Sequence, residues 1–202
     1  MKSTGLVISS FMMGLLNSDP LASDPRGPAW LEQSIDAAKD LGAKVILVAF
    51  FGRGSLLRGK ELKTDDVDVV VERLKAAAPR AKEAGVILGI ENTLSAQQNL
   101  DILGRIGHDS VRIYYDVGNT TSMGYDVPAE IRQLNDKIAI FHFKDGPSYL
   151  GEGKVKYAPI AEAIRAINYQ GWIVLETSNP SKDRIADTKR NAAFIRKLFG
   201  MG

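Results

Sequence analysis

The chain has 202 residues and an almost balanced charge, with 26 Lys and Arg against 24 Asp and Glu. Hydrophobic residues make up 45% and charged residues 25% of the sequence, which is typical of a globular domain and excludes a disordered chain. The balance argues against a protein that binds nucleic acid by neutralising phosphates, because such proteins carry a basic surplus. With no cysteine, disulfide scaffolds, thiolate zinc sites and cysteine nucleophiles are excluded as well.

The N-terminal segment has some features of a signal peptide, because an apolar run from Gly5 to Leu16 follows Lys2. The run contains Ser9 and Ser10 and lacks a clean small-x-small cleavage site. No stretch of the sequence approaches the ~18 continuous apolar residues of a membrane span. We therefore expect a cytoplasmic protein with no membrane partner.

Six short apolar runs alternate with longer helical patterns, which is typical of βα units with a parallel sheet. Each run is rich in Val, Ile, Leu or aromatic residues and is too short to be a helix. The predicted strands are Gly5 to Phe11, Lys44 to Phe51, Val86 to Glu91, Val111 to Asp116, Ile138 to Phe143 and Trp172 to Thr177.

The predicted helices lie between these runs and end at recognisable stop signals such as Gly42. They are Pro28 to Leu41, Thr64 to the stop at Gly85, Ala96 to Ile106, Val127 to Leu134, Ala158 to Asn168 and Ser181 to Leu198. In the last helix we expect Ser181 to be the N-cap. Its expected core-facing stripe is Ile185, Thr188, Ala192, Ile195 and Phe199.

The pattern is not interrupted by a linker, a low-complexity tract or a block of charge, so we expect a single domain over residues 1–202. An open sheet and a (β/α)8 barrel both fit alternating units, but the glycine fingerprints of nucleotide-binding folds are absent, which favours the barrel. A complete barrel usually needs about 250 residues. The sequence therefore predicts an α/β fold with a TIM-barrel-like parallel sheet of six βα units, an incomplete barrel.

Potential metal ligands stand at the ends of four consecutive predicted strands, where functional residues gather in parallel α/β folds. These are Glu91, Asp116, His142 and Glu176. Each alone could simply begin a solvated loop, but four in register favour one site. Carboxylates and an imidazole suit a divalent ion such as Mn²⁺, Mg²⁺ or Co²⁺, with Zn²⁺ less natural. A cation would also relieve the mutual repulsion of three neighbouring carboxylates.

The sequence around these residues carries a resemblance that extends over nearly the whole chain. Its parts are Glu91 in I-E-N, Asp116 in Y-Y-D-V-G-N, His142 in F-H-F-K-D, the segment Gly151-Glu152-Gly153, and Glu176 in L-E-T-S. In this order and spacing the chain resembles the xylose isomerase-like barrel superfamily of sugar and sugar phosphate isomerases and epimerases. By this resemblance the first two βα units of the family are missing, in agreement with the length.

The resemblance implies one divalent ion held by Glu91, Asp116, His142 and Glu176, with a ketose or aldose bound through adjacent oxygens. Glu91 and Glu176 would then form the catalytic acid/base pair that moves a carbon-bound proton through an enediolate. The sequence leaves open which of the two abstracts the proton.

Three further residues are candidates for substrate binding. Asn119 stands where epimerases of this family often carry a histidine, and it can hydrogen-bond a sugar hydroxyl but cannot carry a proton. Gln97 stands where some relatives have a substrate-binding Glu. Lys144 could meet a sugar oxygen or a phosphate, or could equally form a salt bridge that orients its loop.

Three functions stay open. For an enzyme of this superfamily, the expected partner is a small sugar or sugar phosphate. The favoured function is a metal-dependent isomerase or epimerase. The others are an inositol-type keto-sugar dehydratase of the same superfamily and a non-catalytic barrel that acts as a binding scaffold. A relative acting on abasic DNA is disfavoured, because such proteins use several extra histidines and this chain has two. Open strand edges of a shortened barrel also lead us to expect a homo-oligomer.

Overall fold

The computed structural model describes residues 4–201, so Lys2 of the signal-like pattern lies outside the described residues. The chain divides into two compact units between Tyr114 and Tyr115. This division falls inside strand β6 (Val111–Asp116), not in a linker. Among the described residues the strand order of the main sheet is β1-β2-β5-β6-β7-β8, which is the order in the chain. The predicted α/β fold with six parallel strands, an incomplete TIM barrel, is confirmed.

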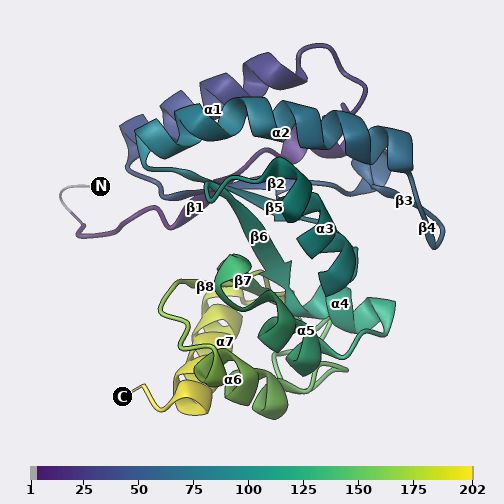
Figure 1. The fold of residues 1–202 in the computed structure, drawn as a ribbon. Helices are drawn as coiled ribbons and strands as arrows, with labels where there is room; N and C mark the ends of the chain where they lie inside the picture. The colour runs from purple at the N-terminus through teal and green to yellow at the C-terminus, as the bar shows by residue number, and fades with distance from the viewer. Residues whose placement is uncertain (1–3, 202) are drawn as a thin grey trace. The chain divides into compact units, whose positions relative to one another are not determined.

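The first unit is a parallel sheet covered by helices. Its strands are β1 (Ser10–Met12), β2 (Val45–Ala49), β5 (Ile87–Glu91) and the first part of β6. Its α-helices are α1 (Gly27–Leu41), α2 (Thr64–Ala84) and α3 (Ala96–Ile106). Helices α1 and α2 lie side by side, with α1 against β2 and α2 against β5 (Figure 1). All residues of β2 are buried, as its uninterrupted apolar sequence predicts.

The second unit contains the end of β6, then β7 (Ile138–Phe143) and β8 (Ile173–Leu175), which pair in parallel. Its helices are α4 (Val117–Met123), α5 (Val127–Leu134), α6 (Tyr157–Ala166) and α7 (Arg184–Phe199). Aromatic side chains fill its core. The Phe141 ring lies 4.8 Å from the Tyr169 ring, and the Phe143 ring lies 5.3 Å from the Tyr157 ring, measured between centroids. Such aromatic pairs stabilise beyond the area they bury.

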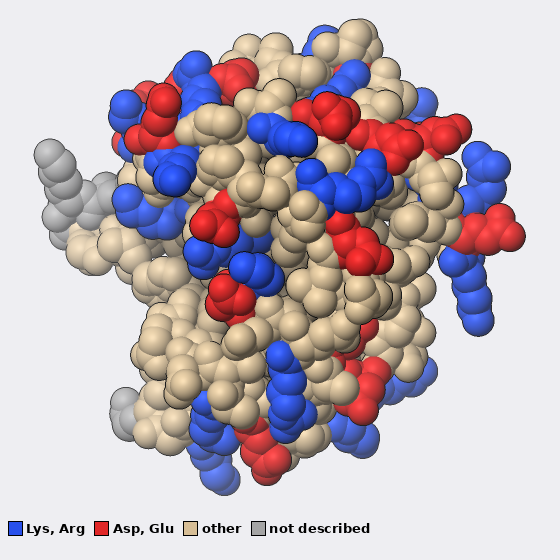
Figure 2. Space-filling view, viewed as in Figure 1, with Lys and Arg blue, Asp and Glu red and all other residues tan. Residues whose placement is uncertain are grey.

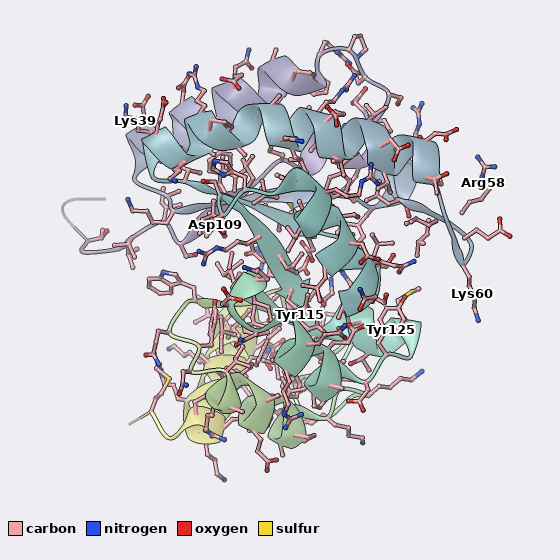
Figure 3. All side chains as sticks on the ribbon, viewed as in Figure 1. Lys39, Arg58, Lys60, Asp109, Tyr115 and Tyr125 are labelled. Carbon is pink, nitrogen blue, oxygen red and sulfur yellow. The ribbon has the colours of Figure 1, made fainter. Side chains whose placement is uncertain are left out.

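The structure also contains short helices and a hairpin that the sequence analysis did not predict. They are the 3-10 helices η1 (Gly14–Asn17), η2 (Gly52–Gly54) and η3 (Asn135–Lys137) and a hairpin of β3 (Leu57–Arg58) and β4 (Glu61–Leu62). Arg58 and Lys60 project from this hairpin into solvent (Figure 3). On the face shown in Figure 2, basic and acidic side chains are interspersed. Among the described residues, no helix combines the length and hydropathy needed to span a membrane.

The first strand begins later than predicted. Leu6 and Val7, which the prediction placed in the strand, have exposed fractions of 71% and 69%. Strand β1 pairs with β2 from Ser10 opposite Val45 onward. Because β2 itself starts at Val45, residues before Ser10 have no neighbouring strand in β2 to pair with. The strand therefore spans only Ser10–Met12.

The last helix also differs from its prediction. Its N-cap is Asp183, whose side chain accepts a hydrogen bond from the Ala186 amide, and not Ser181. Ile185, expected in the core, is 70% exposed. The buried residues of α7 are instead Asp187, Asn191 and Ile195, so of the expected stripe only Ile195 is fully buried. Thr188 is exposed, and Ala192 and Phe199 are half-buried.

The inward face of α7 is polar because it binds a loop of the same unit. The Tyr149 hydroxyl donates to Asp187 Oδ1 at 2.7 Å, and the Leu150 amide donates to Asn191 Oδ1 at 3.0 Å. Ser181 Oγ donates to the same Asp187 oxygen at 2.6 Å. Burial alone would raise the pKa of Asp187, but these hydrogen bonds from Ser181 and Tyr149 lower it below its ordinary value. Polar partners thus replace the predicted apolar stripe.

Candidate metal centre

Asp116 is held rigidly at the junction of β6 and α4. Its Oδ1 atom accepts a hydrogen bond from the Asn119 amide at 2.7 Å, so this side chain is the N-cap of α4. The residue is 2% exposed. Since Oδ1 is used by the cap, the position of Oδ2 is fixed as well. The sequence analysis predicted no helix between Asp116 and Val127 and so missed α4.

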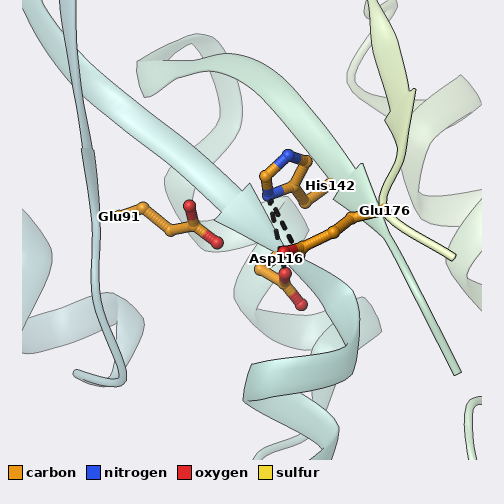
Figure 4. Close-up of side chains that lie close together, drawn as sticks. All are labelled: Glu91, Asp116, His142 and Glu176. Carbon is orange, nitrogen blue, oxygen red and sulfur yellow. Dashed lines mark ion pairs between the residues drawn. The ribbon is translucent and has the colours of Figure 1, made fainter. Parts of the chain in front are cut away.

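Three of the predicted ligands come together in the second unit. His142 Nδ1 lies 3.7 Å from Asp116 Oδ2 and 3.6 Å from Glu176 Oε2 (Figure 4). Asp116 ends β6, His142 is the penultimate residue of β7, and Glu176 directly follows β8. The side chains of Asp116 and His142 are buried, while that of Glu176 is 53% exposed. The cluster is therefore buried on the side of Asp116 and His142 and open to solvent on the side of Glu176.

The same two carboxylates hold Lys144. Its Nζ atom lies 2.9 Å from Asp116 Oδ2 and 2.7 Å from Glu176 Oε2. Burial alone would lower the pKa of Lys144, but the charges of Asp116 and Glu176 outweigh it and raise the pKa above its ordinary value. The ammonium is thus charged, and it compensates the carboxylates in part.

The donor set of Asp116, His142 and Glu176 fits a divalent cation. Each residue offers one ligand atom, and these atoms lie within 4.8 Å of one another. Two ligands of one metal with bonds of ~2.1 Å lie roughly 3 Å apart, close to the distances from His142 Nδ1 to the two oxygens. Among the described residues, Asp116 Oδ2 is buried without an aligned hydrogen-bond donor, its contact with Lys144 being an ion pair. A buried carboxylate oxygen of this kind is well placed to bind a cation.

Asp145 organises the loop that follows the cluster, and sequence reasoning missed this role. Its carboxylate accepts hydrogen bonds from the amides of Gly151, Gly153 and Val155, at 2.9 to 3.0 Å. Asp145 is 4% exposed. The signal in the sequence was the closely spaced glycines, which let backbone amides approach one carboxylate. The segment Gly151-Glu152-Gly153 is thereby held against Asp145, which directly follows Lys144 in the sequence.

The other predicted site residues have the following positions. Glu91 is the last residue of β5, is buried, and pairs with Ala49 of β2 in the first unit. Gln97 lies exposed in the first turn of α3, and its amide donates to Asp101 of the same helix at 2.9 Å. Asn119 is half-buried in α4. The metal-binding and catalytic roles of Glu91 and the substrate-binding roles of Gln97 and Asn119 stay predictions.

Gly118 must remain a glycine because Lys144 packs against it. A Cβ atom at this position would lie 2.5 Å from Lys144 Cγ and 2.9 Å from the Lys144 carbonyl oxygen. We expect Gly118→Ala to lower the free energy of unfolding by about 1–3 kcal/mol, the usual effect of overpacking. Urea denaturation would measure it, with Gly104→Ala as control, because a Cβ atom there meets nothing within 4 Å. An unchanged stability in Gly118→Ala would contradict the close packing.

The chain is similar to known proteins in both sequence and fold. A family profile described as xylose isomerase-like TIM barrel matches residues 1–198. The chain is 27% identical over 205 residues to a putative L-ribulose-5-phosphate 3-epimerase of Escherichia coli (strain K12), covering 87% of this chain and 68% of that protein. It is 26% identical over 182 residues to the inosose dehydratase of Lacticaseibacillus casei, covering 70% of this chain and 60% of that enzyme.

A solved structure of L-ribulose 3-epimerase has a similar fold. The TM-score is 0.85 at 24% sequence identity, and the match covers 98% of this chain and 77% of that chain. In the sequence comparisons the chain spans 68% of the length of the putative epimerase and 60% of the length of the dehydratase. The family profile matches nearly the whole length of this chain. The chain belongs to the xylose isomerase-like TIM barrel family.

Proposed function

We propose that the chain is a divalent-metal-dependent isomerase or epimerase of a ketose or sugar phosphate. The observation that carries the proposal is the contact of His142 with Asp116 and Glu176, at 3.7 and 3.6 Å, at the carboxyl ends of parallel strands. That is the edge where parallel α/β barrels carry their chemistry. The similarity to a putative L-ribulose-5-phosphate 3-epimerase supports the same reaction class.

Glu91 is proposed as the fourth ligand of the metal. It ends β5, and β5 pairs in parallel with β6, the strand that ends in Asp116. Neighbouring parallel strands present their carboxyl ends at the same edge. The resulting set of three carboxylates and one imidazole suits Mn²⁺, Mg²⁺ or Co²⁺, and Zn²⁺ is also compatible.

The proposed reaction moves one proton on and off a carbon next to the sugar carbonyl. A bound metal would polarise the adjacent carbonyl and hydroxyl oxygens and stabilise the enediolate. Glu91 and Glu176 are the proposed acid/base pair, one removing the proton and the other returning it. Return on the opposite face of the carbon inverts its configuration, which is an epimerisation. Asn119, Lys144 and Gln97 are the proposed partners of the sugar hydroxyls or phosphate.

A dehydratase of an inositol-type keto sugar is the second candidate, because the chain is also similar to an inosose dehydratase. Such an enzyme would use the same base to remove the proton but would then expel a hydroxyl group. The two candidates differ in their products. An epimerase gives an isomer of unchanged mass, whereas a dehydratase gives a product lighter by one water, so mass spectrometry separates them.

The first test of the proposal is metal binding, measured by calorimetry with Mn²⁺. We expect the wild-type chain to bind one ion, and we expect Asp116→Ala and His142→Ala to bind it at least about tenfold more weakly, since each loses a direct ligand. Ketoses and their phosphates would then be screened for turnover with the loaded protein. If the wild type binds no Mn²⁺, the metal site is refuted and a non-catalytic scaffold becomes the better explanation.

Self-association is proposed for the same chain. Strands β1 and β8 stand at the two ends of the strand order among the described residues, and unpaired strand edges favour association. Sedimentation should therefore detect a homo-oligomer. A monodisperse monomer with a fully cooperative thermal transition would contradict this part of the proposal.

A further inference from the structure

The ammonium group of Lys144 contacts two of the carboxylates that are proposed to bind the metal. Its Nζ atom contacts Asp116 Oδ2 and Glu176 Oε2 at 2.9 and 2.7 Å. These are the same two oxygens that lie nearest His142 Nδ1. An ammonium group and a divalent cation would thus use the same carboxylate oxygens. Two positive charges so close together repel strongly in a partly buried site.

Only the ammonium end of Lys144 can move away from a cation that binds to the two carboxylates. The Lys144 carbonyl accepts a hydrogen bond from the Tyr157 hydroxyl at 2.9 Å, which fixes the backbone. The Cγ atom of the side chain is packed against Gly118, where even a Cβ atom would not fit. The next residue, Asp145, is held by three backbone amides. Beyond Cγ, the lysine stem has rotatable bonds that can carry the ammonium away from the carboxylates.

We infer that Lys144 is a built-in counter-ion that holds the ligand carboxylates together before the metal binds and is displaced by the metal. This inference rests on the proposed metal site and adds a competition that the site alone does not require. Before metal arrives, the ammonium compensates Asp116, whose side chain is completely buried. A buried carboxylate without a cation would be costly. When the ammonium leaves, it becomes available to the oxygens of a bound substrate.

The test compares Mn²⁺ affinity in the wild type and in Lys144→Met, with Lys144→Arg as the matched control that keeps the charge. Methionine keeps an unbranched stem against Gly118 but has no charge. We expect Lys144→Met to bind Mn²⁺ about tenfold more tightly or more, because the metal no longer displaces a charge-assisted contact. We expect the metal-free variant to melt at a lower temperature than the metal-free wild type, and saturating Mn²⁺ to remove this difference.

The outcomes separate the competition from the metal site itself. Equal or weaker Mn²⁺ affinity in Lys144→Met than in the wild type overturns the competition and leaves the metal site intact. Absence of binding in both proteins overturns both. If Lys144→Met fails to fold, the Cε resonance of Lys144 in the wild type, assigned by its loss in Lys144→Arg, is followed during titration with Mg²⁺. A clear shift supports displacement, and an unmoved resonance at saturating Mg²⁺ overturns it.

Discussion

Glu176→Gln is expected to lower kcat by about 10²- to 10⁴-fold, the usual effect of removing a general acid or base. Glutamine keeps the length of the side chain and one oxygen that can still lie beside His142, but its amide cannot take up a proton. The rate would be measured at saturating Mn²⁺ with a ketose that the wild type converts. At saturation, a weaker metal affinity of the variant does not contribute to the loss.

The matched control for this prediction is Glu162→Gln, an exposed position on α6 in the same unit. It removes the same charge by the same exchange, so its turnover should equal that of the wild type. A Glu176→Gln variant that is as active as the wild type would refute the acid/base role of Glu176. Comparison with Glu91→Gln in deuterated water tells the two carboxylates apart, because only loss of the abstracting group stops uptake of deuterium into the substrate.

Elements whose limits are set by local signals could be predicted from the sequence. Helix α3 spans Ala96–Ile106 as predicted, because Ser95 and Gln98 form a capping box at its start and Gly107 adopts a positive φ at its end. Strand β2 was recognisable because five successive apolar residues require burial on both faces of a sheet. In each case the residues that decide the boundary lie within the element or next to it.

Elements whose limits depend on distant partners could not be predicted. The start of β1 at Ser10 is set by the start of β2 at Val45, thirty-five residues later in the chain. The inward face of α7 is set by Tyr149 and Leu150, which bind Asp187 and Asn191. A periodicity rule places apolar residues inward, and it fails where a loop supplies hydrogen bonds that make polar residues suitable for burial.

The candidate site also has features that follow from local sequence and features that depend on distant partners. The rule that parallel strands carry functional residues at their carboxyl ends was enough to group Asp116, His142 and Glu176. For Lys144 the sequence analysis allowed a salt bridge, and the structure shows one with Asp116 and Glu176. These two partners were not predictable, because a long side chain after a strand reaches solvent as easily as a carboxylate. The role of Asp145 depends on a loop that folds back over it from six to ten residues later.

Asp145→Ala is expected to lower the free energy of unfolding by about 3 kcal/mol, because hydrogen bonds to a charged group are stronger than neutral ones and the variant leaves the buried Val155 amide unpaired. The amides of Gly151 and Gly153 lie in more exposed residues and can bind water instead, so the full sum of three bonds is not lost. For a chain of this size the midpoint of thermal unfolding should fall by roughly 6 to 12 °C. Calorimetry of the metal-free protein measures it.

Two variants decide whether the loss comes from these hydrogen bonds. Asp136→Ala removes an exposed aspartate of the same unit, whose contact with Lys137 is a surface ion pair, so its stability should stay close to that of the wild type. Asp145→Asn keeps one acceptor oxygen but places an amide donor against backbone donors, and it should be intermediate or as unstable as Asp145→Ala. If Asp145→Ala melts together with Asp136→Ala, the loop does not depend on this carboxylate. The placement of Gly151-Glu152-Gly153 must then have another cause.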